Sequence, residues 1–368
     1  MFNKILIVKI NYNMTISVCI ITLNEEKVIK RLLNCVKKFA DEIILVDTGS
    51  VDKTVEIAKE FTDKIYYFKW VDDFSKARNF AFSKAKCDYL FWIDADDVIT
   101  DENVSKILKL KNQNSEYADT YMFKYSCGFD NNQKPSLTFY RERLIKNCSL
   151  AKFQGFVHET VSPFGVVRYE NIEIEHRKKS ASNPKRNLNL YKKHLPISNF
   201  SQRDVYYFAK EYFYLGYYKT AIKLLKTYLN MKYKYAPDQK DALITLSFCY
   251  KSLKMKGYEK FLFTALKEVG IDSQILSLIG DYFLDNNDLI NAEKYYKICL
   301  CLQKNDNIGF CYNQFYYIYP LLQLAYLNYR KGDLKQSYYY HKLCKKDSPN
   351  DIRVIENDNF FAKMQKNK

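Results

Sequence analysis

Glycine, proline and histidine are scarce in this sequence. Its 368 residues include 10 Gly, 7 Pro and 4 His. Because so few residues interrupt regular structure, the chain is not expected to be disordered, and long helices and strands are favoured. Ten cysteines are scattered without any CxxC pair, and with four histidines they offer little zinc chemistry. Since the sequence also lacks a secretion signal, we interpret the cysteines as reduced, mostly buried thiols.

Long apolar runs are also missing. The N-terminal run from Ile5 to Val8 is too short for the core of a signal peptide, and no later stretch is long enough to span a membrane. These absences predict a soluble, cytoplasmic protein. Residues 1–14 are expected to be an N-terminal extension. Either Met1 or Met14 is expected to be the true start, because the first clear strand begins just after Met14.

The positive charge is concentrated in the second half of the chain. Residues 1–180 hold 28 Lys and Arg against 25 Asp and Glu, a net charge of +3, and the remaining residues carry +13 of the total of +16. A lysine-rich solvated surface explains this most simply. The alternative is a basic second domain that binds an acidic macromolecule or makes peripheral contact with an anionic membrane. Nucleic acid is not an expected partner, because the chain has no zinc finger or Arg-rich helix.

The first half of the chain alternates strand-like and helix-like segments. Strands are predicted at 15–23, 42–47, 64–70 and 88–94, and amphipathic helices at 25–39, 54–61 and 75–85. This order is typical of a mostly parallel sheet covered by helices, in which ligands bind beyond the carboxyl ends of the strands. From about residue 118 to 176 the pattern indicates strands of an added antiparallel layer.

The second half is helical. Large and small residues recur at a spacing typical of tetratricopeptide repeats, and the corresponding positions 216, 254, 287 and 332 are 38, 33 and 45 residues apart. The long last gap predicts an insertion. We expect four degenerate helical hairpins stacked as a short solenoid, with an irregular helical bundle as the alternative. The predicted organisation is therefore an α/β domain at 15–180, a linker at 181–200 and a helical domain at 201–368.

Three acids crowd the end of the fourth predicted strand, in FWIDADDVIT. Asp94, Asp96 and Asp97 would repel one another unless a cation lies among them. Carboxylate oxygens suit Mg²⁺ or Mn²⁺, which usually arrives with phosphates attached. The sequence thus predicts a site for a cation–diphosphate complex at this edge of the sheet.

Other polar residues follow the first three strands. Asp47 ends the second strand without an obvious basic partner, so it would be free to accept from a base or a ribose, and Ser50 would cap the next helix. Thr22 and Glu25 have the spacing of a capping box, and that structural role alone would explain them. Arg78 and Asn79 lie in the third helix and would face either a diphosphate or solvent.

Four segments in this order, TLNEE, VDTGSVDKT, DDFSKARNFA and WIDADD, resemble the family 2 glycosyltransferases. The resemblance covers residues 16 to about 176 and implies a Rossmann-like α/β nucleotide-sugar-binding domain of the GT-A fold, followed here by an all-α tetratricopeptide-like domain. It implies a UDP-sugar as donor substrate and Mn²⁺ or Mg²⁺ as cofactor. At the nucleoside, the resemblance implies that Asp47 would hold the uracil ring and that Thr22 and Glu25 would line the site. Asp94 would contact ribose or metal, and Asp96 would bind the metal. Arg78 and Asn79 would support the donor.

Further segments narrow the resemblance. The later part of the chain resembles a subgroup that includes the peptide S-glycosyltransferases of glycocin biosynthesis. The resemblance rests, in chain order, on Arg143, KFQGFVHETV, IEIEH, the RNLNLYKK helix and the repeats. By this resemblance Gly155, His158 and Glu159 would close the donor site. His158 would complete metal or diphosphate binding, and Glu159 would orient the acceptor or act as its base. His176 is followed by RKKSA instead of the Gly-Tyr of the subgroup, so the resemblance assigns His176 no ligand role.

The predicted activity is transfer of a hexose from a UDP-sugar, with inversion, to a Cys, Ser or Thr side chain of a peptide or protein. Asp97 and Glu159 are the candidate bases. Two alternatives stay open: a transferase acting on a lipid-linked or cell-surface glycan, and an inactive scaffold that binds partners through its repeats. A homodimer through the helical domain is also expected, because its Tyr/Phe-rich helices would leave apolar surface exposed.

Overall fold

The computed structural model describes residues 13–113, 117–177, 183–194, 200–232, 235–304 and 309–366. The chain divides into two compact units, one of residues 1–125 with 140–181 and one of residues 126–139 with 182–368. Most of the predicted N-terminal extension, 1–12, lies outside the described residues, as do 181–182 and 195–199 of the predicted linker. The described part of that linker contains a helix, α5 (Arg186–Lys193), which groups with the second unit.

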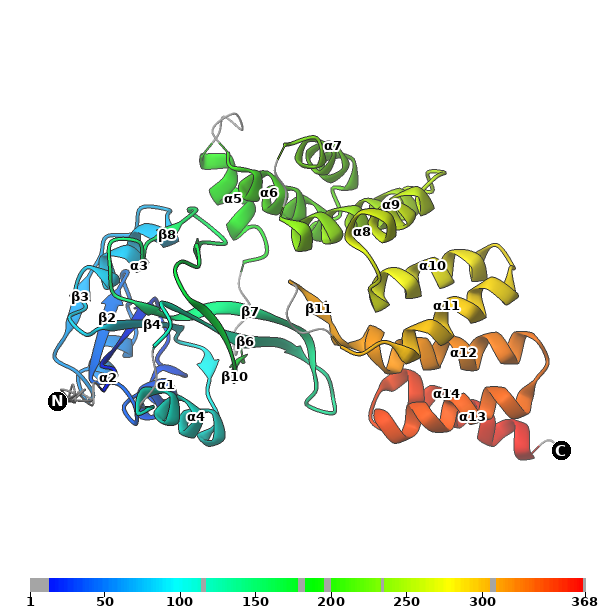
Figure 1. The fold of residues 1–368 in the computed structure, drawn as a ribbon, viewed down its shortest axis with the longest axis horizontal. Coiled ribbons are helices and arrows are strands. Elements are labelled where there is room, and N and C mark those ends of the chain that lie inside the picture. The colour runs from blue at the N-terminus through cyan, green and yellow to red at the C-terminus, as the bar shows by residue number, and fades with distance from the viewer. Residues whose placement is uncertain are drawn as a thin grey trace, which may run out of the picture. The chain divides into compact units, whose positions relative to one another are not determined.

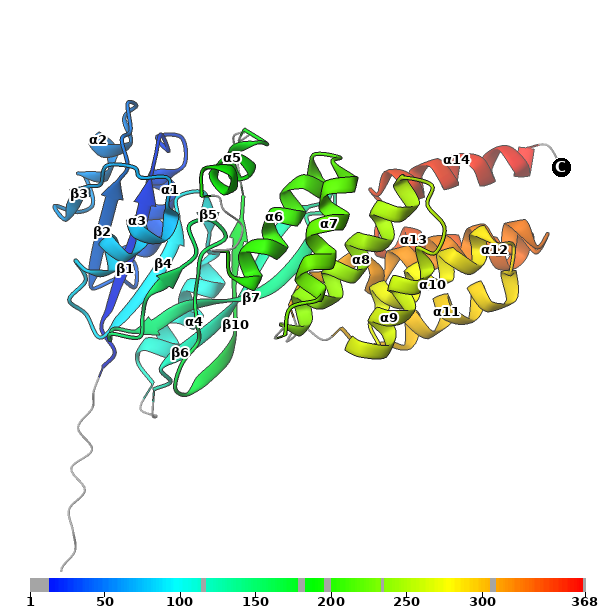
Figure 2. The same cartoon turned by 90° about the horizontal axis from the view of Figure 1, so that it is seen from above.

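The first unit is built on four parallel strands, as predicted. They are β1 (Ile16–Thr22), β2 (Glu42–Asp47), β3 (Ile65–Tyr67) and β4 (Tyr89–Asp94), in the order β3-β2-β1-β4 (Figure 1 and Figure 2). All six residues of β2 are buried. Such continuous burial is expected when helices cover both faces of a parallel sheet.

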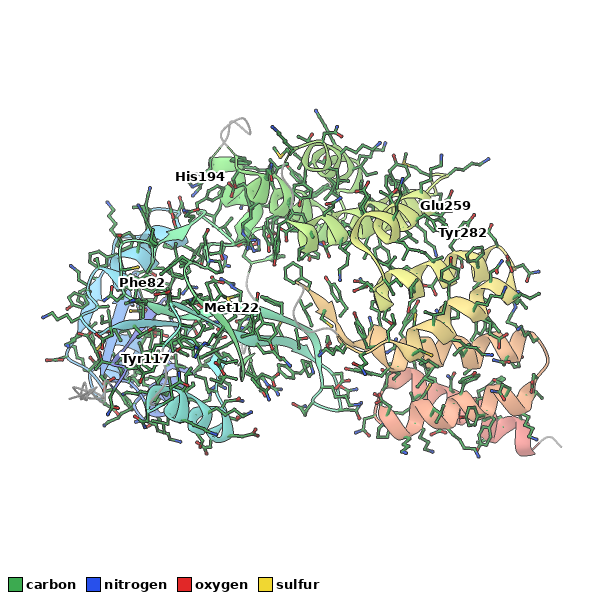
Figure 3. The ribbon with its side chains drawn as sticks, in the orientation of Figure 1. Phe82, Tyr117, Met122, His194, Glu259 and Tyr282 are labelled. Atoms are coloured by element: carbon green, nitrogen blue, oxygen red, sulfur yellow. The ribbon has the colours of Figure 1, made fainter. Side chains whose placement is uncertain are left out.

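Four helices accompany these strands: α1 (Ile29–Val36), α2 (Thr54–Ala58), α3 (Phe74–Phe82) and α4 (Asp101–Lys111). Helix α3, which carries Phe82 (Figure 3), packs on β1 and β2. Phe82 shares a buried cluster with Trp92 of β4. The preceding residue of β4, Phe91, lies on the other face, where its ring is 5.3 Å from that of Phe39. The alternation along β4 therefore directs Trp92 toward α3.

The predicted antiparallel layer extends this sheet. Strands β6 (Thr120–Phe129), β7 (Pro135–Lys146), β10 (Val167–His176) and the two-residue β5 (Asp97–Val98) follow β4 in the order β4-β7-β6-β10-β5. Strands β8 (Phe153–Gln154) and β9 (Thr160–Val161) form a separate hairpin. In the β5–β10 pair, His176 stands opposite Asp97.

The second unit contains the four expected helical hairpins (Figure 2). They are α6 (Gln202–Tyr214) with α7 (Tyr218–Leu229), α8 (Ala236–Ser252) with α9 (Glu259–Val269), α10 (Ser273–Asp285) with α11 (Leu289–Cys301), and α12 (Ile318–Arg330) with α13 (Leu334–Asp347), followed by α14 (Ile352–Lys366). The residues predicted to correspond, Gly216, Lys254, Asn287 and Gly332, all have positive φ, from 54° to 80°. Each therefore makes the same left-handed turn between two helices.

The insertion predicted in the last gap is present between α11 and α12. Its described part carries β11 (Cys311–Tyr312) and the short 3₁₀ helix η2 (Asn313–Tyr316). Strand β11 pairs with the part of β7 that belongs to this unit, with Cys311 opposite Thr138.

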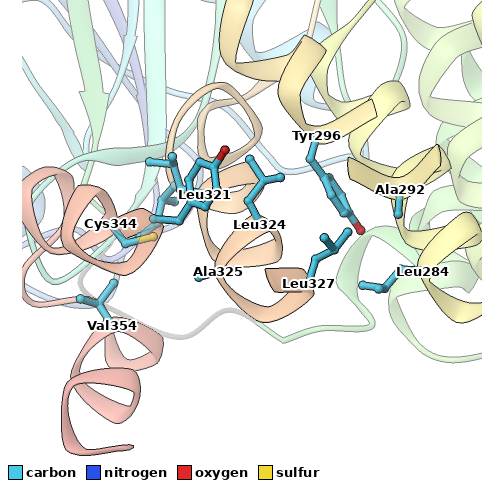
Figure 4. Packing of buried hydrophobic residues seen from close by; sticks show 11 residues of the cluster. Leu284, Ala292, Tyr296, Leu321, Leu324, Ala325, Leu327, Cys344 and Val354 are labelled. Carbon is cyan, nitrogen blue, oxygen red and sulfur yellow. The ribbon is translucent and has the colours of Figure 1, made fainter. Parts of the chain in front are cut away.

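Buried side chains from successive hairpins form a continuous core in this unit. One cluster joins Leu284, Ala292, Tyr296, Leu321, Leu324, Ala325, Leu327, Cys344 and Val354 (Figure 4). Gly280 of α10 lies against the Tyr296 ring, and a Cβ there would be 2.6 Å from a ring carbon. Glycine is therefore required for α10 and α11 to approach this closely.

Candidate active site

The carboxylates at the end of β4 are neutralised partly by arginines. Nη2 of Arg78 donates to Oδ1 of Asp94 and its Nε donates to Oε1 of Glu159, each over 2.6 Å. Burial lowers the pKa of Arg78, but these two carboxylates raise it further than burial lowers it. Burial alone would raise the pKa of Asp94. The positive charge of Arg78 outweighs burial and holds the pKa of Asp94 well below its usual range. Arg78 and Asp94 are therefore both charged at neutral pH.

Asp97 is paired with a second arginine. Its side chain is fully buried, and Nη1 of Arg143, which is equally buried, lies 3.2 Å from Oδ2. The hydroxyl of Tyr125 donates to Oδ1 over 2.8 Å. Both arginines pack on Trp92, because the guanidinium carbons of Arg78 and Arg143 lie 4.8 and 3.8 Å from its ring centre. Two of the three crowded acids thus have internal counter-charges.

Asp96 is different. Among the described residues, its carboxylate has no lysine or arginine partner, and its charged neighbour is His176, whose Nδ1 lies 3.4 Å from Oδ1. Burial, with the negative charges of Asp94 and Asp97, raises the pKa of Asp96 although His176 opposes this. The Asp96 side chain keeps 18% of its surface exposed. This carboxylate is therefore accessible and incompletely neutralised.

His176 completes a group that could hold a metal. Ligand atoms of Asp96, Asp97 and His176 all lie within 4.8 Å of one another. Burial lowers the pKa of His176, but the nearby carboxylates, first Asp97 and then Asp96, raise it above its usual value. Two carboxylates and an imidazole suit Mn²⁺ or Mg²⁺, so the residues fit the expected cation. The sequence pattern argued against a third ligand at His176, and its place beside both acids makes it a candidate ligand. The antiparallel pairing of IEIEH with the strand that begins at Asp97 is what brings His176 to the acids.

An open cavity of about 230 Å³ adjoins Asp96. It is lined by Asn24, Glu25, Glu26, Lys27, Val28, Asp52 and Asp96. The backbone N–H of Glu25 donates to the hydroxyl of Thr54 over 2.7 Å, which fixes this wall. The structure therefore brings together Glu25, predicted to line the nucleoside, and Asp96, predicted to bind metal.

Asp47 and Thr22 have partners that the sequence did not suggest. Asp47 is buried, and its carboxylate accepts from the N–H groups of Gly49 and Ser50 over 3.1 and 3.0 Å. The Thr22 hydroxyl lies 3.5 Å from the same carboxylate. Asp47 therefore holds the turn after β2, and its binding of a base or a ribose stays a prediction.

Two predicted helix caps are wrong. Helix α1 begins at Ile29 without a side-chain cap, so Thr22 and Glu25 form no capping box. Helix α2 likewise has no side-chain cap, and the Ser50 hydroxyl accepts instead from the N–H of Asn24 over 2.9 Å. The Ser50 side chain bonds to the loop after β1, and the first residue of α2, Thr54, donates its N–H to Asp52 instead.

The β8–β9 hairpin is attached to α3. Both ends of the Asn79 amide bond the backbone of Phe153, Nδ2 to the carbonyl over 3.0 Å and Oδ1 to the N–H over 2.8 Å. The loop of this hairpin needs positive φ at Gly155 (89°) and His158 (54°). It delivers Glu159 to Arg78. Among the described residues, the group of three side chains that could hold a metal ion contains His176 and does not contain His158.

Comparison with known proteins agrees with this geometry. Residues 17–169 match the Glycosyl transferase family 2 profile, so the chain contains a family 2 glycosyltransferase domain. The SPbeta prophage-derived glycosyltransferase SunS of Bacillus subtilis (strain 168) is 31% identical over 266 residues, which cover 66% of this chain and 60% of SunS. A TPR repeat-containing protein of Synechococcus elongatus is 33% identical over 147 residues, covering 40% of this chain and 35% of that protein.

The chain thus spans about 60% of the length of SunS. Likeness to solved structures is weak: the crystal structure of S. aureus TarS covers 77% of this chain and 55% of TarS, with 15% identity and a TM-score of 0.35, too low to carry weight. Within the described ranges, no helix combines the length and apolar character needed to cross a membrane.

Proposed function

We propose that this protein is an inverting glycosyltransferase that moves a hexose from a UDP-sugar to a Cys, Ser or Thr side chain of a peptide or protein. The observation that carries the proposal is the Asp96–His176 pair beside a cavity at the carboxyl ends of β1 and β4. Ligands of such sheets bind at this edge, and Asp96 lies within residues 17–169, which match the family 2 profile.

The donor would occupy the cavity that Glu25 lines. Asp96 and His176 would hold Mn²⁺ or Mg²⁺, which offsets the negative charge that develops on the leaving UDP. Asp47 and Thr22 would shape the nucleoside end through the turn after β2. Asp94, held ionised by Arg78, would accept from ribose, and Asn79 would keep the β8–β9 hairpin in place.

The acceptor atom would form its bond to the anomeric carbon as the bond from that carbon to the UDP oxygen breaks. The proton of the acceptor would pass to Glu159, which we favour over Asp97 as base. Asp97 is fully enclosed, whereas the Glu159 side chain keeps 11% of its surface exposed. A cysteine thiol, with a pKa of about 8.5, needs less help from a base than a hydroxyl does.

The repeat unit restricts where a peptide acceptor can bind. Part of the polar surface of α8 and α10 is occupied by the chain's own insertion, because Nζ of Lys240 donates to the Phe310 carbonyl over 3.3 Å and the Tyr316 hydroxyl donates to Asp272 over 3.2 Å. We therefore propose that the acceptor binds elsewhere on this unit. The +13 charge of the second half of the chain favours an acidic peptide segment.

UDP release by the purified chain tests the donor site. A panel of UDP-sugars is incubated with Mn²⁺ or with EDTA, without acceptor, for the wild type, Asp96→Ala and the exposed control Asp101→Ala. We expect slow metal-dependent hydrolysis of one sugar that Asp96→Ala abolishes and Asp101→Ala preserves. If the folded protein shows no turnover and binds no UDP-sugar, the inactive scaffold becomes the better hypothesis. Transfer to a lipid-linked glycan but to no peptide would overturn the acceptor assignment.

A further inference from the structure

Arg143 of β7 is buried in an unusual way. Its side chain has no exposed surface, and its guanidinium carbon lies 3.8 Å from the centre of the Trp92 ring and 4.4 Å from that of Tyr125. Its Nη1 donates to the Trp92 carbonyl over 3.2 Å, but its Nε and Nη2 have no hydrogen-bond partner among the described residues. Burying a cation with unmet donors is costly, so packing alone is a weak reason for an arginine here.

The group that Arg143 fixes is the carboxylate of Asp97. Oδ2 of Asp97 faces Nη1 of Arg143 at 3.2 Å and accepts from the backbone N–H of Asp94 over 3.2 Å. Oδ1 accepts from the Tyr125 hydroxyl over 2.8 Å and lies 3.3 Å from Nδ1 of His176. A fully buried carboxylate with these partners cannot reorient without breaking several of them.

Asp97 in turn orients His176. A histidine that binds a metal commonly has a carboxylate on its ring, and this partner fixes the ring orientation and the position of its proton. Here Asp97 lies 3.3 Å from Nδ1, so Nε2, the other ring nitrogen, is the one that would bind the cation. Arg143 pairs with Asp97, so of the two carboxylates beside His176 it is Asp96 that lines the cavity without an arginine partner among the described residues.

We propose that Arg143 and Tyr125 are positioning residues for the divalent-cation site: they fix Asp97, and Asp97 fixes His176 beside Asp96. This inference rests on the proposed function, because it assumes that Asp96 and His176 hold the cation. It differs from a purely structural role in what it predicts. A structural Arg143 would change the stability of the protein, whereas a positioning Arg143 changes its affinity for the metal.

Tyr125→Phe is the mildest test, because it deletes the hydroxyl on Asp97 and keeps the ring against Arg143. Tyr121→Phe is the matched control. Tyr121 is also buried on β6, four residues earlier, and its hydroxyl accepts from the Ala118 N–H over 2.9 Å, away from the acids. Arg143→Lys and Arg143→Met form a second pair, one keeping the charge and the other removing it.

The measurement is Mn²⁺ affinity, read from free Mn²⁺ by electron paramagnetic resonance with UDP present, together with thermal unfolding of each variant. We expect Tyr125→Phe to weaken Mn²⁺ binding about tenfold, as loss of a residue behind a metal ligand typically does. Tyr121→Phe should lower the unfolding temperature without changing Mn²⁺ affinity, and Arg143→Lys should keep more affinity than Arg143→Met.

Two negative results can be told apart. Wild-type protein that binds no Mn²⁺ would remove the proposed metal site, and the inference with it. If the wild type binds Mn²⁺ and both Tyr125→Phe and Arg143→Lys bind it equally well, the metal site stands and the positioning role is overturned.

Discussion

Nδ1 of His176 lies 3.4 Å from Oδ1 of Asp96, which joins the end of β10 to the turn that follows β4. In the described structure His176, rather than His158, is the histidine that forms a possible metal-binding group with Asp96 and Asp97. The two histidines therefore offer competing assignments that experiment can separate.

We expect His176→Ala to reduce Mn²⁺-dependent UDP release at least about tenfold and to raise the Mn²⁺ concentration needed for half-maximal rate, because it removes a metal ligand. His158→Ala should leave that Mn²⁺ concentration unchanged. The measurement is the initial rate of UDP release as a function of Mn²⁺ for both variants. A shift in His158→Ala alone would restore the ligand role that the sequence resemblance implied.

The strands and the helical turns could be read from the sequence because their signals are local. The buried run EIILVD and the left-handed turns at Gly216 and Gly332 each depend on a few adjacent residues. The counter-charges of the acids could not be read in this way. Phe91 pairs with Leu144, and this register, set by tertiary packing, is what carries Arg143 to Trp92. A sequence predicts that three acids need a cation but not that arginines supply part of the charge.

Replacing Arg78 should be strongly destabilising. Arg78→Met leaves Asp94 and Glu159 without their counter-charge in a mostly buried site, and we expect the free energy of unfolding to fall by about 3 kcal/mol. Lys76→Met on the same helix is the control. Lys76 is largely exposed and lies 3.5 Å from Asp73, so its loss should cost less than about 1 kcal/mol. Urea unfolding of both variants measures the difference, and equal losses would contradict this account.

Two neighbouring acids of α8 should respond oppositely to replacement. Burial raises the pKa of Asp238 to about 6. Folding therefore favours its neutral form, and the stability it contributes, complete below about pH 4, is lost as the pH rises through about 6. Burial also acts on Asp241, but Lys210, 2.6 Å away, lowers its pKa, so its stabilising contribution is kept at neutral pH and lost in acid.

Asp238→Asn should therefore raise the free energy of unfolding by about 1 kcal/mol at about pH 8 and change it little at about pH 4. Asp241→Asn should lower it at about pH 8, because it leaves Lys210 buried without a counter-charge. Urea unfolding at the two pH values measures both. Destabilisation by Asp238→Asn at the higher pH would show that its interaction with Arg203, at 3.8 Å, outweighs the cost of burial.

The insertion should be separable from the donor chemistry. Its docking uses Ser273, whose hydroxyl donates to the Phe315 carbonyl, and Asp272, which accepts from Tyr316. Ser273→Ala combined with Tyr316→Phe removes both bonds but keeps the pairing of β11 with β7, the bond from Lys240 to the Phe310 carbonyl and the bond from Asn313 to the Pro135 carbonyl. We expect faster amide hydrogen exchange at Cys311 and Tyr312 and an unchanged rate of acceptor-free UDP release, since neither bond reaches the acids of β4. Unchanged exchange would mean that the remaining contacts, among them the β11–β7 pair, are enough to hold the insertion. A higher rate of transfer to peptide in the double variant would mean that the insertion competes with the acceptor for α8 and α10, and would overturn the proposal that the acceptor binds elsewhere on this unit.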